Sequence, residues 1–184
     1  MNHTTDAEQL WRDNCPSRFV DATDDLDAHT NAHVESWVGA GGRNLLLLGP
    51  SDVGKTHAAL VAARRWLHVY QHVWWFVPLL ELLNALRESA PDPNAALDRA
   101  MSVPLLVLDD LGFDRPIDWT LEERLYIIVN QRWLDQRPTV ATSNLTVEGG
   151  QGPLVDAISA RTYSRLVQDA VVVQMAGRDL RRVV

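Results

Sequence analysis

The chain has 184 residues, of which 46% are hydrophobic and 22% charged, and its formal net charge is −7. This length fits one domain with its own core, and the hydrophobic content excludes a chain that is disordered throughout. The single cysteine, Cys15, excludes a disulfide framework, no apolar run approaches the roughly 20 residues of a membrane span, and residues 1–30 show no signal peptide. We therefore expect a cytoplasmic protein with no membrane partner.

Residues 1–35 are polar and acidic, and we expect them to form an arm with at most one short helix, ahead of a folded domain over 36–184. The rest of the chain alternates short apolar runs with segments of helical periodicity. Strands are expected at 44–48, 72–77, 104–109, 139–142 and 170–174. Helices are expected at 55–68, 79–88, 95–101, 120–136 and 153–166, the fourth opened by a capping box of Thr120 and Glu123. Because the central strands are apolar throughout, the alternation predicts an α/β fold whose parallel sheet is covered on both faces.

The charges are distributed unevenly along the chain. Residues 1–42 carry eight acidic residues and two arginines, whereas residues 151–184 carry five arginines and three acidic residues. The overall acidity argues against binding of nucleic acid through bulk charge. An anionic partner is therefore expected to meet the C-terminal end.

A glycine-rich loop stands between the first expected strand and the first expected helix. Its sequence, GPSDVGKT, matches the phosphate-binding pattern G-x4-G-K-[ST], in which backbone N–H groups and a lysine face phosphate oxygens. Lys55 is the only lysine in the chain, and the Thr56 hydroxyl would bind Mg²⁺. We expect nucleotide contacts from the whole loop and the start of the helix, namely Gly49, Pro50, Ser51, Asp52, Val53, Gly54, Lys55, Thr56 and His57.

Polar residues also end two of the expected strands. Asp109 would hold Mg²⁺ through water, opposite Thr56, and Asp110 stands where an acid could activate the attacking water. Asn144 follows the next strand, and because parallel strands end at one edge, it is expected beside Asp110. The alternative for all three is a role in turns or helix caps, where Asp and Asn are common.

Arg161 and Arg165 are four residues apart and so share one face of the expected helix 153–166. They are either surface charges or arginines that stabilise a γ-phosphate across a subunit interface. The aromatic run Trp74–Phe76 likewise has two interpretations, base stacking on single-stranded nucleic acid and a buried strand, and we favour the buried strand. No spacing of histidines or cysteines predicts a metal site made by the protein alone.

Four segments in this order, GPSDVGKT, LLVLDDLG, TVATSN and ISARTYSRL, resemble the AAA+ ATPases of the DnaC/IstB group. This group includes bacterial and phage helicase loaders and transposition helper ATPases. The resemblance covers nearly the whole chain, from Arg18 to Arg182. It implies a P-loop NTPase fold, the AAA+ core, with five parallel strands in the order 5-1-4-3-2, helices on both faces and no C-terminal helical lid.

The resemblance also assigns roles to individual residues. It implies that ATP and Mg²⁺ are bound and that subunits associate through the face carrying Arg165. By position, Walker A comprises Gly49, Gly54, Lys55 and Thr56, and Walker B comprises Asp109 and Asp110. Asn144 corresponds to sensor 1, and Arg165 corresponds to the arginine finger, with Arg161 as its neighbour. The segment Arg18–Val20 corresponds to the one that lies against the adenine.

The expected function is that of an ATP-hydrolysing loader of a hexameric replicative helicase, with single-stranded DNA as a further partner. Three alternatives stay open: a transposition helper ATPase, a nucleotide-stabilised assembly scaffold, and a P-loop kinase. A kinase would need acceptor-binding arginines in a lid over the phosphates, and none is evident. Residues 1–17, with Leu10 and Trp11 as apolar anchors, could serve as a docking peptide.

Overall fold

A computed structural model describes residues 3–112, 117–147 and 152–176, with side chains from residue 7 onward. Within these ranges it contains a sheet of five strands: β1 (Leu45–Leu48), β2 (Trp74–Pro78), β3 (Leu105–Asp109), β4 (Thr139–Ser143) and β5 (Val171–Gln174). Every pair is parallel, and the order β2-β3-β4-β1-β5 is the expected order 5-1-4-3-2 counted from the other edge. The predicted fold class is confirmed.

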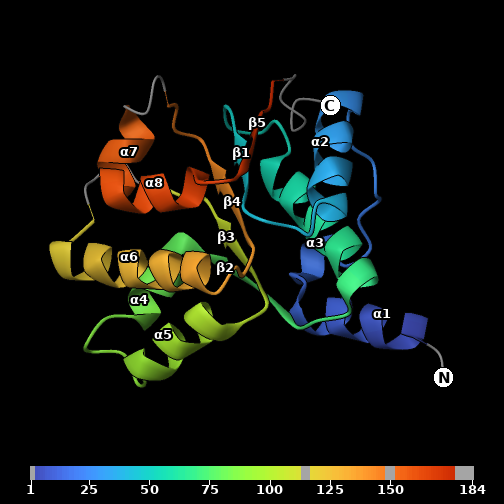
Figure 1. The fold of residues 1–184 in the computed structure, drawn as a ribbon. Helices are drawn as coiled ribbons and strands as arrows, with labels where there is room; N and C mark the ends of the chain where they lie inside the picture. The colour runs from blue at the N-terminus through green and yellow to red at the C-terminus, as the bar shows by residue number, and fades with distance from the viewer. Residues whose placement is uncertain (1–2, 113–116, 148–151, 177–184) are drawn as a thin grey trace.

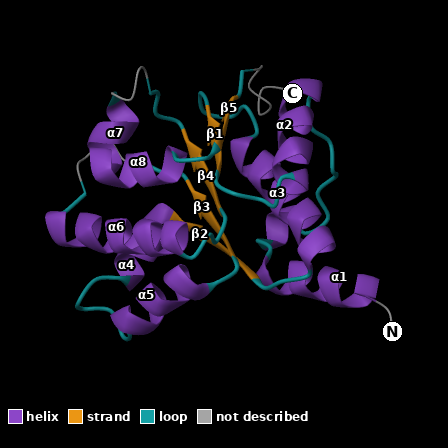
Figure 2. Ribbon diagram, viewed as in Figure 1, coloured by secondary structure: helices purple, strands orange, loops and turns teal. Residues whose placement is uncertain are grey.

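Helices cover both faces of the sheet, which makes a three-layered molecule (Figures 1 and 2). One layer comprises α1 (His3–Asn14), α2 (Ala28–Gly39) and α3 (Lys55–Tyr70). The other comprises α4 (Leu79–Ala85), α5 (Pro93–Ser102), α6 (Trp119–Leu134), α7 (Pro153–Ile158) and α8 (Ala160–Val167). Among the helices of the described ranges, none is both long enough and apolar enough to cross a membrane.

Successive residues of a central strand belong alternately to two hydrophobic cores, one on each face of the sheet. Leu45 and Leu47 pack with the layer of α1, α2 and α3, whereas Leu46 and Leu48 pack with the opposite layer. Successive side chains of a strand point to opposite faces, so a strand covered on both sides must be apolar at each position. Because the strands are parallel, the loops that follow β1, β3 and β4 all leave the sheet at the C-terminal ends of the strands. The candidate site lies there.

The N-terminal segment differs from the expected arm. It contains α1, a 3₁₀ turn at Ser17–Phe19 and most of α2, so the expected boundary after residue 35 falls inside a helix. Trp11 is buried and stacks on Trp74, with ring centroids 5.1 Å apart. The expectation of an arm with at most one short helix is therefore corrected. The few apolar residues that dock this segment are spaced along mostly polar helices, and composition alone conceals them.

Two other local expectations are corrected. Helix α6 begins at Trp119, and its N-cap is Asp118, whose side chain accepts a hydrogen bond from the Thr120 N–H at 3.0 Å, in place of the capping box. The expected helix 153–166 is two helices, α7 and α8, which are separated by Ser159 in the left-handed region at φ 68°. The Ser159 hydroxyl donates to Glu122 of α6 at 2.7 Å, so a tertiary contact accompanies the break.

Candidate nucleotide-binding site

The loop between β1 and α3 has a backbone that requires glycine at both ends. At Gly49 a Cβ atom would lie 2.2 Å from the Met175 carbonyl oxygen, and φ is 155°. Gly54 caps α3 with φ 88°, a left-handed conformation that glycine adopts at little cost. The loop consequently delivers the N-terminus of a helix of four turns to the sheet edge, where N–H groups and the helix dipole favour an anion.

Lys55 is held inside this loop. Its side chain is 7% exposed, and Nζ donates a hydrogen bond to the Pro50 carbonyl at 2.5 Å. Burial lowers the pKa of Lys55, and the nearby carboxylates of Asp110 and Asp109 oppose that shift. The ammonium group is thus positioned across the loop by a neutral carbonyl, a partner that phosphate oxygens can replace.

Asp109 at the end of β3 faces Thr56 of α3. The Thr56 hydroxyl lies 3.0 Å from Oδ1 and 3.1 Å from Oδ2 of Asp109, and the Thr142 hydroxyl of β4 donates to Oδ1 at 2.7 Å. Burial raises the pKa of Asp109, whereas the hydrogen bonds from Thr142 and Thr56 lower it. A carboxylate and a hydroxyl at this separation form an all-oxygen donor set, which fits Mg²⁺.

Asp110 and Asn144 lie together, as predicted. Asn144 Nδ2 donates to Asp110 Oδ1 at 3.2 Å, and both side chains are exposed toward the cavity described next. Asp110 adopts the left-handed conformation with φ 60°, which is uncommon for a residue other than glycine. Its N–H donates to Thr142 Oγ1 at 2.8 Å.

A cavity of about 540 Å³ joins these groups, a size typical of small-molecule sites. Of the predicted loop contacts, Gly49, Pro50 and Val53 complete the loop without lining the cavity. Arg18 and Phe19 reach it from the N-terminal segment. The cavity is lined by Arg18, Phe19, Ser51, Asp52, Gly54, Lys55, Thr56, His57, Asp109, Asp110, Thr142 and Asn144.

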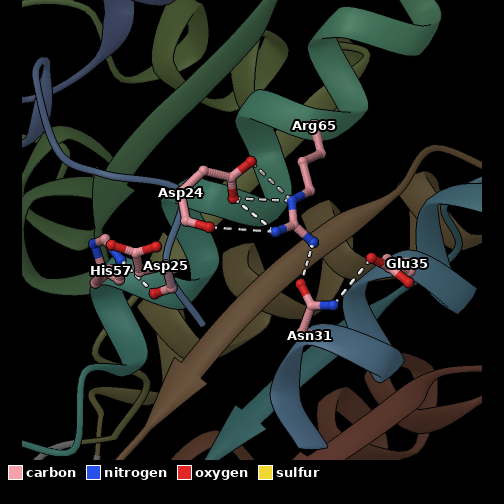
Figure 3. A network of polar contacts seen from close by, with 6 residues as sticks. All are labelled: Asp24, Asp25, Asn31, Glu35, His57 and Arg65. Carbon is pink, nitrogen blue, oxygen red and sulfur yellow. Dashed lines mark hydrogen bonds and ion pairs between the residues drawn. The ribbon is translucent and has the colours of Figure 1, made fainter. Parts of the chain in front are cut away.

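A polar network ties the N-terminal segment to α3 beside the cavity (Figure 3). Arg65 binds the Asp24 carboxylate, with its shortest contact at 2.7 Å, and donates to Asn31 Oδ1 at 2.8 Å. His57, which directly follows the phosphate loop, hydrogen-bonds through Nε2 to the Asp25 carbonyl at 3.1 Å. The segment that carries Asp24, Asp25 and Asn31 is therefore fastened to α3, the helix that follows the phosphate loop.

The structure does not bring Arg161 or Arg165 to this cavity. Arg161 pairs with Glu122 at 3.0 Å and lies over the Tyr126 ring, 4.6 Å from its centroid. Arg165 donates to Asn130 Oδ1 at 3.0 Å and stacks over Trp133, 4.3 Å from its ring centroid. Both arginines are held against residues of α6 in their own chain, outside the lining of this cavity.

Thr142 is the site residue that the sequence analysis missed. Its signal was present, because Thr142 lies near the C-terminal end of β4, two residues before Asn144, and parallel strands end at the same side of the sheet. The sequence does not reveal the role of the Thr142 hydroxyl, because threonine is common in strands for reasons of packing alone.

Comparison with known proteins identifies relatives of this chain. It is 32% identical over 146 residues to the phage-like element PBSX protein XkdC of Bacillus subtilis strain 168, a match covering 74% of this chain and 53% of that protein. It is 26% identical over 178 residues to the replicative helicase loader DnaI of the same strain, covering 90% and 55%. The chain thus spans about half the length of the curated relatives it matches.

The fold of this chain is similar to that of a solved helicase loader. A crystal structure of the DnaC helicase loader superposes with a TM-score of 0.73 and 21% sequence identity, covering 88% of this chain and 100% of that chain. The sequence model described as IstB-like ATP binding protein matches residues 19–183. The phosphate loop, the acidic end of β3 and Asn144 all lie inside this match. The chain belongs to the IstB-like ATP-binding proteins and has the AAA+ core fold.

Proposed function

We propose that this protein hydrolyses ATP with Mg²⁺ and acts as a switch that loads a replicative DNA helicase. The observation that carries the ATPase proposal is the pairing of Thr56 with Asp109 across the end of the phosphate loop, at 3.0 and 3.1 Å. In phosphoryl-transfer sites such a pair holds Mg²⁺. Here Thr56 would hold the ion directly and Asp109 through water, and the ion would supply positive charge to balance that of the phosphates.

The other residues of the site have complementary roles in this proposal. Lys55 exchanges its Pro50 carbonyl partner for phosphate oxygens. Asp110 accepts a proton from the attacking water, and Asn144, hydrogen-bonded to Asp110, orients that water or the γ-phosphate. Arg18 and Phe19 line the same cavity, and the resemblance implies that this segment lies against the adenine.

Two observations support a helicase as the partner. The relative that matches the largest share of this chain among those described above is a replicative helicase loader, and the fold superposes on that of a second loader. The alternative is a transposition helper ATPase, which the IstB-like family match supports. Self-association through the face carrying Arg165 and contact with single-stranded DNA belong to the same proposal.

Calorimetry with ATP and Mg²⁺ tests the first part. We expect wild-type protein to bind ATP and Lys55→Ala to lose tight binding, because it removes the ammonium group inside the loop. Equal ATP affinity in the two proteins would contradict the assignment of the phosphate loop. A scaffold whose hydrolysis is vestigial would bind ATP but show no turnover.

The partner is tested by co-purification in the presence of ATP. We expect the protein to retain a hexameric replicative helicase and not a transposase from its host, and the opposite outcome would support the transposition alternative. Fluorescence anisotropy with a labelled single-stranded oligonucleotide tests DNA binding. That binding should be weak and fall steeply with salt, because few phosphates are contacted per subunit.

A further inference from the structure

The loop after β3 is built around one buried side chain, that of Thr142. This residue is 2% exposed and lies in β4, between β3 and β1. Its hydroxyl contacts Asp109 at 2.7 Å and Asp110 at 2.8 Å, and its carbonyl accepts the Leu111 N–H at 2.7 Å. Three successive residues of the neighbouring strand and loop are therefore fastened to a single position.

The Thr142 hydroxyl is a donor in one of its two hydrogen bonds and an acceptor in the other. A hydroxyl has one proton to donate and lone pairs to accept with. The proton goes to Oδ1 of Asp109, and a lone pair accepts the N–H of Asp110. The same oxygen thus orients the carboxylate that faces Thr56 and holds Asp110 in its left-handed backbone conformation.

We infer that Thr142 is a positioning residue that places Asp109 for Mg²⁺ and Asp110 for the attacking water. This inference rests on the proposed ATPase function. Without the hydroxyl, Asp109 loses its shortest hydrogen bond. The N–H of Asp110 loses its acceptor, which helps to hold this residue at φ 60°. Both acids would then sample other orientations, although neither has been changed.

Thr142→Val is the informative substitution, because valine has nearly the same shape and no hydroxyl. Thr142→Ser keeps the hydroxyl and removes only a methyl group. Thr139→Val is the matched control: Thr139 lies on the same strand, is 1% exposed, and uses its hydroxyl to accept a hydrogen bond from Arg132 at 3.0 Å, outside the cavity lining. Thr142→Ala replaces Thr142→Val if circular dichroism shows that the valine variant does not fold.

The measurements are ATP affinity in EDTA, the Mg²⁺ concentration for half-maximal ATP binding, and turnover. We expect Thr142→Val to keep the wild-type affinity for ATP in EDTA, because the phosphate loop is intact. The Mg²⁺ concentration for half-maximal ATP binding should rise by about tenfold or more, which is the effect of losing a hydrogen bond to a charged group. Turnover should fall as well. Thr142→Ser should restore both values, and Thr139→Val should leave both unchanged even where it lowers the free energy of unfolding.

Wild-type Mg²⁺ dependence and turnover in Thr142→Val would overturn this inference alone. So would an equal defect in Thr139→Val, since the effect would then be one of the strand in general. Absence of ATP binding by wild-type protein would instead overturn the proposed function and, with it, this assignment.

Discussion

The indole rings of Trp11 and Trp74 stack almost in parallel, with an interplanar angle of 8°. Each ring also donates a hydrogen bond to the main chain of the N-terminal segment: Trp11 Nε1 to the Val20 carbonyl and Trp74 Nε1 to the Leu10 carbonyl, both at 3.0 Å. Helix α1 is thereby fastened to the edge strand β2 by both packing and polar contacts. Stacked aromatic pairs stabilise beyond the area they bury.

Trp11→Ala should strongly destabilise the fold. The residue is 2% exposed, and truncation of a buried tryptophan typically costs about 3–5 kcal/mol of unfolding free energy. Urea denaturation measures the change. Trp119→Ala, at a position that is 73% exposed, is the matched control and should change the free energy of unfolding by less than about 0.5 kcal/mol. Equal effects of the two substitutions would show that α1 does not belong to the cooperative core.

The stability of the protein should also depend on pH through Cys15. Burial raises the pKa of this thiol from 9.0 to about 11, an effect larger than the opposing charge of Arg64. Since the folded state prefers the protonated thiol, the associated stability is complete below pH 9 and is lost as pH rises toward 11. Urea denaturation at pH 8 and 10.5 should show a steeper loss in wild type than in Cys15→Ala. Equal losses in the two proteins would exclude the thiol as the cause.

Asp110→Asn should separate binding of the nucleotide from its hydrolysis. The amide keeps the size of the side chain but cannot accept a proton, so affinity for ATP with Mg²⁺ should persist while turnover is lost. Calorimetry and phosphate release measure the two quantities on the same preparation. Hydrolysis at the wild-type rate would reject Asp110 as the base and direct attention to Asp114, which lies outside the described residues.

Arg165→Ala tests whether a neighbouring subunit completes the site. The variant should bind ATP normally and lose stimulated hydrolysis; arginine fingers contribute about 10³–10⁵ in rate in GTPases, and a slow switch would use less. Because Arg165 also contacts Asn130 and Trp133, urea denaturation must show that the fold is retained.

Mixing Arg165→Ala with Lys55→Ala provides the control. A finger that acts between subunits lets an intact Arg165 on one chain serve an intact Lys55 on another, so turnover should recover in the mixture. A defect in Arg161→Ala alone would identify the other arginine. Wild-type rates in both single variants would make both arginines surface charges.

Much of the site could be predicted from contiguous residues. In the phosphate loop, the glycines, Lys55 and Thr56 act over one turn and one helix end, so their spacing along the chain nearly determines their arrangement in space. The positions of the five strands along the chain were also predictable, because burial on both faces of a parallel sheet requires apolar runs such as 45–48. Asn144 was placed beside Asp110 because parallel strands end at one edge.

Only the tertiary structure decided the remaining relationships, since each depends on contacts between residues far apart in the chain. The hydroxyl of Thr142 acquires its role from a neighbouring strand, and the break at Ser159 coincides with a hydrogen bond to Glu122. Helix α1 carries a polar sequence that docks through a few side chains such as Trp11. Local patterns indicate most strands and helices, whereas the break at Ser159 and the partner of each side chain depend on distant segments that the sheet brings together.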